Sequence, residues 1–403
     1  MIKLGEAWGI EILKGIGKLF LNPLTYWIFL LIFFSGLRRV RKERNNFGIK
    51  IVDIFSEWKG TRSIAIIAGV LLSGLCVGLG IVFSYETLFL LCVVSIVLSL
   101  LLRFTMLSPS YTIGLTVIML LFIPTIIANQ SYFDSDLFND INFIGLAMLI
   151  GIFLLIESFL TLRIRREETY PDLVLGQRGK WIGFHHIKKL SVIPFFTLVP
   201  TGLLTPFADY WPYITFDGET YSLLLFPFLL GFDHTVKGVV PEKAAESIGR
   251  KVGLLGFIVL LVAIGSIFYW ILAVFAAVLA ILGREFISYK HRVTDNRMQP
   301  FFSKEKRGLS IIAIIPNTPA DRLDIQVGET ISKVNGQQIH DVTEFYQSLQ
   351  GSGAFFKLEV LDLAGEPRLL QSALYQNDHH ELGLVFVKDR YREKKKSLKE
   401  TSN

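Results

Sequence analysis

Two neighbouring stretches decide how the C-terminal part of the chain folds: Ile311-Ile312-Ala313-Ile314-Ile315-Pro316-Asn317-Thr318-Pro319-Ala320 and Gly328-Glu329-Thr330-Ile331-Ser332-Lys333-Val334-Asn335-Gly336. In the first, an apolar run that stops at a proline predicts a strand. Thr318 before Pro319 then predicts the capped start of a short helix. The second stretch predicts another strand, which a tight turn at Asn335-Gly336 closes. A strand therefore leads into a helix and then into a second strand.

The residues that follow complete a small domain. Asp341 or Thr343 is placed to cap a second helix over residues 342–349. Apolar runs at residues 356–361, 369–374 and 382–387 predict three more strands. We therefore expect residues 308–387 to form a compact α/β domain.

This domain resembles a circularly permuted bacterial PDZ domain. Pro319-Ala320, Gly328-Glu329-Thr330-Ile331 and Leu382-Gly383-Leu384 resemble the family's core motif. The chain departs from that motif at Leu323-Asp324, which replaces the usual Ala-Gly, and at Glu329, where Asp is commoner. The resemblance implies peptide binding by addition of a strand to a sheet edge, with Gly383 leaving room for the partner's main chain. It assigns the binding residues to the last strand and the second helix: Glu381, Leu382, Gly383, Leu384, Val385, Phe386, Val342, Phe345 and Leu349.

The rest of the chain has the composition of a membrane protein. The 403 residues are 51% hydrophobic, and the mean hydropathy is +0.48. Since the PDZ-like domain is far more polar, the apolar excess must lie in the first part of the chain. Residues 21–283 are therefore predicted to form an α-helical membrane bundle of about seven or eight spans.

Basic residues orient the first spans, which are predicted at residues 24–37, 64–83, 88–102, 111–128 and 143–162. Basic clusters at residues 38–44 and 163–189 are expected on the cytoplasmic side, and the acidic loop 129–140 outside. This alternation predicts that the PDZ-like domain lies in the cytoplasm. It does not determine on which side of the membrane the N-terminus lies.

Beyond residue 190 the pattern is less regular. Pro194, Pro200, Pro206 and Pro227 interrupt apolar runs, which predicts broken or re-entrant helices. The uncharged residues 252–283 fit either one long tilted helix or a hairpin that turns near Gly265-Ser266.

Three polar or amphipathic segments flank these domains. Residues 1–20 are expected to form an amphipathic helix at the membrane interface, with direct continuation into the first span as the alternative. Residues 284–307 are expected to form a basic linker. Residues 388–403 are expected to form a basic, disordered tail.

The sequence contains no recognisable catalytic or metal-binding motif. No HExxH pattern occurs, and the adjacent pairs His185-His186 and His379-His380 are interpreted as surface loop residues. Cys76 and Cys92 lie in apolar runs and are interpreted as inert. Glu157 is expected to extend toward Arg163 or Arg165 at the membrane surface. We therefore predict a protein without catalytic residues, metal or cofactor.

Taken over its full length, the chain resembles the MinJ family of cell-division topological determinants. The resemblance includes residues 8–14, the entry to the first span at residues 22–27, the basic run at residues 38–44, a multi-span body and one C-terminal PDZ domain. It implies a division-site adaptor, enriched at septum and poles, that links a DivIVA-type scaffold to the MinD ATPase and restricts assembly of the FtsZ ring and the divisome. A regulator or substrate presenter of a membrane protease, and a transporter, are the alternatives.

Overall fold

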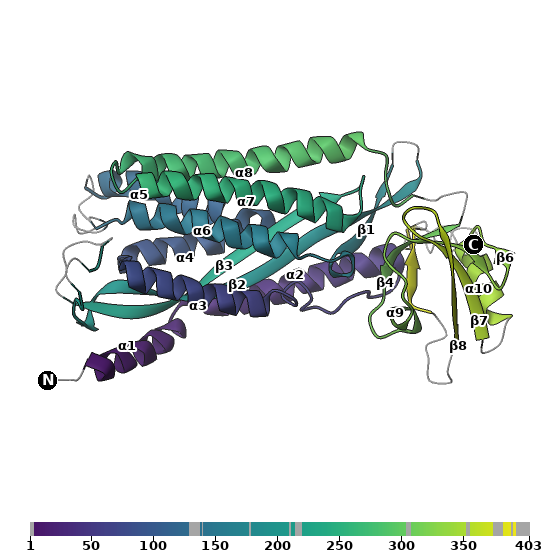
Figure 1. Ribbon diagram of the computed structural model, residues 1–403, viewed down its shortest axis with the longest axis horizontal. Helices are drawn as coiled ribbons and strands as arrows, with labels where there is room; N and C mark the ends of the chain where they lie inside the picture. Colours follow the sequence, from purple (N-terminus) through teal and green to yellow (C-terminus); the bar gives the residue numbers. More distant parts are fainter. Residues whose placement is uncertain are drawn as a thin grey trace, which may run out of the picture.

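The computed structural model describes residues 4–128, 138, 140–176, 179–208, 211–213, 220–303, 308–351, 355–373, 382–387 and 390–391. A helical body with a three-stranded sheet occupies most of the long axis, and a smaller sheet domain lies at one end of it (Figure 1). The elements of the body are α1 (Leu4–Leu19), α2 (Pro23–Phe47), α3 (Arg62–Leu79), α4 (Tyr85–Ser99), η1 (Phe104–Leu107), α5 (Pro109–Ala128), α6 (Phe143–Leu162), η2 (Arg166–Glu168), β1 (Tyr170–Leu175), β2 (Trp181–Leu204), β3 (Tyr221–Val236), α7 (Pro241–Gly265) and α8 (Ile271–Arg297).

Within the described residues, six helices are long and apolar enough to cross a membrane: α2, α3, α5, α6, α7 and α8. Helix α4 has 15 residues and extends about 22 Å, which is less than the ~30 Å hydrocarbon core. Helices α2 to α6 lie where the first five spans were predicted. The predicted total of seven or eight spans is not confirmed.

Helix α1 is separate from the first long helix. Asn22 lies between the two helices and caps the start of α2, because its side-chain oxygen accepts a hydrogen bond from the Leu24 N–H at 2.9 Å. Helix α1 packs on β3, where a Cβ on Gly15 would lie 2.9 Å from the Leu223 carbonyl oxygen. It lies at the end of the body opposite the C-terminal domain (Figure 1).

The two last helices form a hairpin. Helix α7 ends at Gly265 and α8 begins at Ile271, so of the two predicted arrangements for residues 252–283 the hairpin is correct. Helix α8 continues to Arg297, and residues 284–297 are therefore helical rather than part of the predicted linker. No glycine or proline interrupts residues 284–297, so the helix can continue beyond its apolar segment.

Residues 181–236 contain two long strands instead of the predicted broken or re-entrant helices. Strands β2 and β3 pair antiparallel and run alongside the helices (Figure 1). In their register Pro194 lies opposite Pro227, and Pro200 lies opposite Tyr221. Proline fits a strand where its backbone nitrogen points away from the partner strand, because no ladder hydrogen bond is lost there. These prolines therefore belong to a hairpin and do not break a helix.

Beyond the residues that pair with β1, the edge of β2 opposite β3 is hydrogen-bonded to the surrounding helices and loops. The Leu190 N–H donates to the Glu57 carbonyl at 3.0 Å, and the Phe83 N–H donates to the Leu198 carbonyl at 2.9 Å. The Phe196 N–H donates to the Ser73 hydroxyl at 2.8 Å. Unpaired backbone groups are costly in lipid, so these bonds make a buried sheet possible among the helices.

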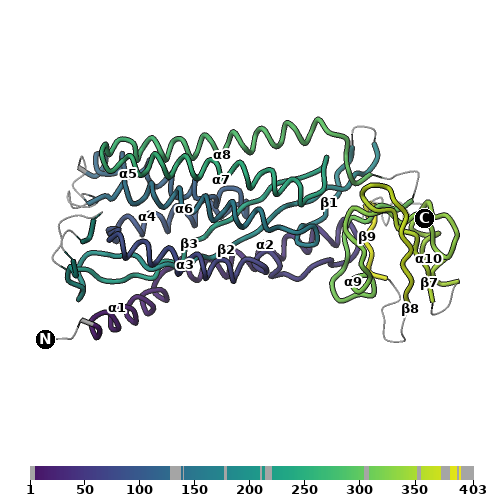
Figure 2. Tube along the Cα trace, viewed as in Figure 1, coloured from purple at the N-terminus to yellow at the C-terminus, as the bar shows by residue number. Residues whose placement is uncertain are grey.

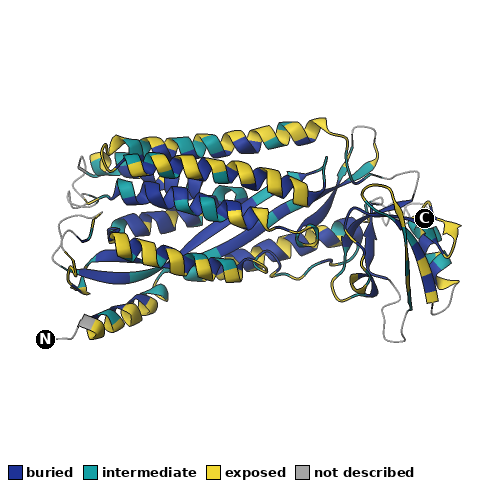
Figure 3. Ribbon diagram, in the orientation of Figure 1, coloured by how far each residue is buried: buried dark blue, intermediate teal, exposed yellow. Residues whose placement is uncertain are grey.

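Burial follows this arrangement. Strands β2 and β3 are mostly buried, whereas the outward faces of α3, α7 and α8 are exposed (Figure 3). Many of these exposed side chains are large and apolar, including Leu71, Leu261 and Phe286. An apolar outer surface around a buried sheet is the pattern expected of a body embedded in lipid.

The C-terminal domain contains β4 (Leu309–Ile314), α9 (Pro319–Arg322), β5 (Thr330–Val334), β6 (Gln337–Gln338), α10 (Val342–Gln350), β7 (Phe355–Leu361), β8 (Pro367–Ala373) and β9 (Leu384–Phe386). The strand order is β8-β7-β5-β4-β9, with β6 paired to β5. Asn335 and Gly336 have φ values of 51° and 84°, which confirms the predicted tight turn. The Asp341 carboxylate accepts hydrogen bonds from the Thr343 and Glu344 N–H groups at 2.7 and 2.8 Å, which confirms the cap of α10.

Candidate functional site

The predicted peptide-binding elements are close together in the structure. Strand β9 is the last strand of its sheet, so one of its edges has no strand partner among the described residues. Helix α10 packs beside it, and the rings of Phe345 and Phe386 have their centroids 5.1 Å apart. A free strand edge beside a helix is the geometry that strand-addition recognition requires.

Most of the predicted binding side chains are buried inside the domain. They fall into three groups: Leu382, Leu384, Phe386, Phe345 and Leu349 belong to the domain core, Val342 is half-buried beside it, and Val385 lies in a second cluster that faces the body. Glu381 lies outside the described residues. The buried side chains therefore hold the strand and the helix in place. The part of β9 that remains able to bind a ligand is the main chain along its unpaired edge.

Gly383 has a structural role that the sequence did not reveal. Its φ is +90°, and a Cβ at this position would lie 2.0 Å from the Thr318 hydroxyl oxygen. Its carbonyl accepts a hydrogen bond from the Ile315 N–H at 2.9 Å. The expectation that Gly383 leaves room for a partner is therefore corrected: the space beside it is filled by Thr318 of the same domain.

The face of the PDZ-like domain that carries β4 and β9 is docked on the body (Figure 2). Ile312, Val385 and Val387 share a buried cluster with Leu173 of β1 and Phe47 of α2. Between the two parts, the Gly183 N–H donates to the Phe302 carbonyl at 2.8 Å, and the Arg166 guanidinium donates to the Gln326 side chain at 2.7 Å. The domain is thus held against the body by apolar and polar contacts.

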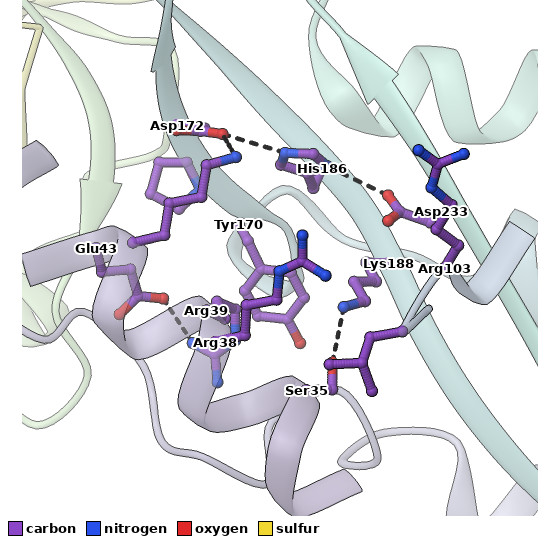
Figure 4. Close-up of a pocket in the computed structure, with 13 residues that line it drawn as sticks. Ser35, Arg38, Arg39, Glu43, Arg103, Tyr170, Asp172, His186, Lys188 and Asp233 are labelled. Atoms are coloured by element: carbon purple, nitrogen blue, oxygen red, sulfur yellow. Dashed lines mark hydrogen bonds and ion pairs between the residues drawn. The ribbon is translucent and has the colours of Figure 1, made fainter. Parts of the chain in front are cut away.

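A second candidate site is a polar cavity of about 190 Å³ near this junction. It lies between α2, β1, β2, β3 and the segment after α4 (Figure 4). Its charged lining comprises Arg38, Arg39, Lys42, Glu43, Arg103, Asp172, His186, Lys188 and Asp233. Basic side chains outnumber carboxylates, so the cavity favours an anion.

His186 lies between two carboxylates of this cavity. Its Nε2 and Nδ1 atoms are 3.2 Å from Asp172 Oδ2 and Asp233 Oδ1 respectively. Burial opposes protonation, but these hydrogen bonds outweigh it and raise the pKa of His186 above its ordinary value. By contrast, burial lowers the pKa of the neighbouring His185 to about 3. Both residues belong to β2, so their interpretation as surface loop residues is wrong; His379-His380 lie outside the described residues.

Glu157 also differs from its expected placement. It is fully buried and pairs with the fully buried Arg284, whose Nη2 atom is 2.8 Å from Glu157 Oε1. Ser108 donates a hydrogen bond to the other carboxylate oxygen at 2.6 Å, and Arg284 also contacts His234 and Ser288 at 3.1 and 2.9 Å. Glu157 thus joins α6 to α8 and does not extend toward Arg163 or Arg165.

Among the residues that the structure describes, no group of three or more His, Cys, Asp or Glu side chains is arranged to hold a metal ion. Cys76 and Cys92 are free and buried in the body. The buried polar sites described above are ion pairs and hydrogen-bonded networks.

Comparison with known proteins identifies the family. Residues 310–355 match the PDZ domain family. Over 394 residues the chain is 35% identical to the cell division topological determinant MinJ of Bacillus subtilis (strain 168), which covers 96% of this chain and 97% of that protein. This chain belongs to the MinJ family. A probable MinJ of Lacticaseibacillus paracasei is 28% identical over 79 residues, which cover 20% of this chain and 22% of that protein. No solved structure matches the chain. The predicted MinJ resemblance and the PDZ domain are confirmed.

Proposed function

We propose that this MinJ-family protein is a membrane-anchored adaptor that helps to place the division septum. The observation that carries the proposal is the end-to-end similarity, at 35% identity, to a cell division topological determinant. In this role it links a DivIVA-type polar scaffold to a MinD-type ATPase, restricts assembly of the FtsZ ring and the divisome, and is enriched at septum and poles. It acts by binding, without a catalytic step or a cofactor.

The proposed orientation places the PDZ domain in the cytoplasm. Helix α2 ends in the basic run of residues 38–44 next to that domain, and Arg390 beyond β9 donates to Asn46 of α2 at 2.8 Å. Basic residues at this end of the helices favour the cytoplasmic side. If α4 crosses together with the six longer helices, the number of crossings is odd and α1 lies at the outer surface.

The proposed recognition element is the free edge of β9 beside α10. Because the side chains of β9 are buried, its affinity comes from main-chain hydrogen bonds, and selectivity comes from residues of α10 such as Val342. Docking of the domain on the body fixes this edge close to the membrane surface. In the proposed role, the groove is presented there to a partner at the membrane surface, such as the MinD-type ATPase.

Partner recovery from cells tests the proposal. Full-length protein and a form lacking residues 308–387 are each recovered from membranes, and the bound proteins are identified. Val342→Glu places a charge beside the groove, and Gln347→Glu adds the same charge on the side of α10 that faces Gln338. We expect the deletion and Val342→Glu to lose a division protein that wild type and Gln347→Glu retain.

Two outcomes contradict the proposal at different levels. If division proteins are recovered but Val342→Glu retains all of them, the groove is not the recognition element, and the body carries the interaction. If a membrane protease or its substrates are recovered in place of division proteins, the adaptor role is wrong and the protease regulator replaces it.

A further inference from the structure

The polar cavity beside α2 contains more positive charge than its carboxylates neutralise. Arg39 is paired with Glu43 at 2.5 Å and with Glu57 at 3.1 Å. Lys42 pairs with Asp172, which also bonds to His186. Asp233 bonds to His186 on its other side. The carboxylates that line the cavity are therefore already engaged.

Three cations of the lining have no carboxylate partner among the described residues: Arg38, Arg103 and Lys188. Lys188 is half-buried, and its ammonium group donates only to the Ser35 hydroxyl at 2.7 Å and lies 4.1 Å from the centre of the Phe104 ring. Arg38 donates to the Leu101 carbonyl at 3.3 Å. Asp233 and Glu57 act on the Lys188 ammonium group only from beyond ion-pair distance. A charged group that is withdrawn from water without a counter-charge in contact favours an anion as its partner.

The position of these cations selects the kind of anion. In Figure 4, Lys188 lies between Arg38 of α2 and Arg103. Arg38 and Arg103 are exposed at the rim. Close to them in the sequence are the apolar residues Leu37 and Leu101, which are 39% and 69% exposed. A ligand bound here meets cationic groups on one side and apolar surface on the other. An anionic phospholipid combines a phosphate group with acyl chains in this way.

We propose that the cavity binds the phosphate of an anionic phospholipid head group. Lys188 lies at the base and contacts the phosphate, while Arg38 and Arg103 close over it from the rim. The acyl chains lie on the apolar surface around Leu37 and Leu101. Guanidinium groups suit phosphate oxygens because they present paired donors in one plane.

Native mass spectrometry of the purified full-length protein tests the site. The probe is 1-palmitoyl-2-oleoyl-phosphatidylglycerol, titrated into protein in a neutral detergent. The comparison is the corresponding phosphatidylcholine, a zwitterion whose phosphate charge is balanced by its own ammonium group. The site variants are Arg38→Gln/Arg103→Gln and Lys188→Met. The matched control is Arg41→Gln/Arg44→Gln, which removes the same charge from exposed residues of α2 that do not line the cavity.

We expect wild type to bind phosphatidylglycerol in preference to phosphatidylcholine, and the two site variants to weaken that binding by about tenfold or more. The control should stay within about twofold of wild type, and Arg38→Lys/Arg103→Lys should retain most of the affinity. Unchanged thermal unfolding of each variant shows that the loss is not a loss of fold.

Three results overturn the proposal. The first is equal loss in the site variants and the control, because it means that net charge alone decides binding. The second is full binding in Arg38→Gln/Arg103→Gln. The third is displacement of phosphatidylglycerol by inorganic phosphate at the same concentration, which assigns the cavity to a free anion instead of a lipid.

Discussion

Breaking the buried ion pair between α6 and α8 should destabilise the body, and more strongly from one side than from the other. The relative exposed area of the side chains of Glu157 and Arg284 is 0% for both. Arg284 reaches the same carboxylate oxygen through Nε at 3.1 Å and through Nη2 at 2.8 Å. The two perturbations are Arg284→Met and Glu157→Gln, each of which removes one charge and leaves the other buried.

The cost of each change depends on whether the remaining group can lose its charge. In Arg284→Met the group left behind is a carboxyl, and a buried carboxyl can in general be accommodated in its neutral form. The hydrogen bond from Ser108 at 2.6 Å remains. In Glu157→Gln the guanidinium cannot release its proton. Removal of one partner of a buried pair costs about 3–5 kcal/mol, so we expect Glu157→Gln to lie at the upper end and Arg284→Met below it.

Thermal unfolding of the full-length protein in detergent, followed by tryptophan fluorescence, measures the difference. A loss of this size should lower Tm by about 10 °C, and the double variant should recover part of it because no lone charge remains. Arg292→Gln is the control: it breaks a pair with Glu285 whose side chains are 59% and 55% exposed, which should cost less than about 1 kcal/mol. If both single variants unfold within about 2 °C of wild type, the pair does not hold α6 to α8.

Two further predictions concern the junction and the PDZ domain. Burial opposes protonation of His186, but hydrogen bonds to the two aspartates raise its pKa in the folded protein above the ordinary value. The protonated His186 therefore stabilises the fold below the unfolded pKa of about 6.5, and this stabilisation is lost as pH rises through the folded pKa. His186→Gln should therefore flatten the dependence of Tm on pH between about pH 6 and 8, and an unchanged curve would contradict the assignment. Gly383→Ala should destabilise the PDZ domain by about 2 kcal/mol or more, since φ is +90° and Thr318 occupies the space. Gly365→Ala, at φ +85° with no neighbour within 4 Å, should lower the free energy of unfolding by only about 1 kcal/mol. Proteolysis in increasing urea compares the stability of the two variants, and equal sensitivity would refute the steric argument.

Local patterns were sufficient for the PDZ domain and for helices α2 to α6. The turn at Asn335-Gly336 and the Asp341 cap depend on residues within a few positions of each other, so the sequence contains their cause. The apolar runs of residues 181–236 were misassigned because a continuous apolar run does not distinguish a buried strand from a buried helix. Whether the backbone nitrogen of Pro194 points away from a partner strand is decided by the pairing of β2 with β3, which the sequence does not show.

The sites show the same division between local and distant causes. The strand and the helix of the groove follow from motif spacing, and the structure does bring β9 and α10 together. The pairing of Glu157 with Arg284 joins residues 127 positions apart, and no periodicity of either helix indicates it. The contact of Gly383 with Thr318 likewise depends on the folded domain.

The β2–β3 hairpin has a consequence for how the protein is made. A helix satisfies its own backbone hydrogen bonds and can enter the bilayer alone, whereas a single strand cannot. Strand β2 can therefore enter the bilayer only together with β3. The edge of β2 opposite β3 forms hydrogen bonds with Glu57, Ser73 and Phe83, which belong to parts of the chain synthesised much earlier. Helices α2 to α6 precede the hairpin, and α7 and α8 follow it. During synthesis the first helices thus form an unfinished assembly, and their packing is completed only when both strands insert together between them.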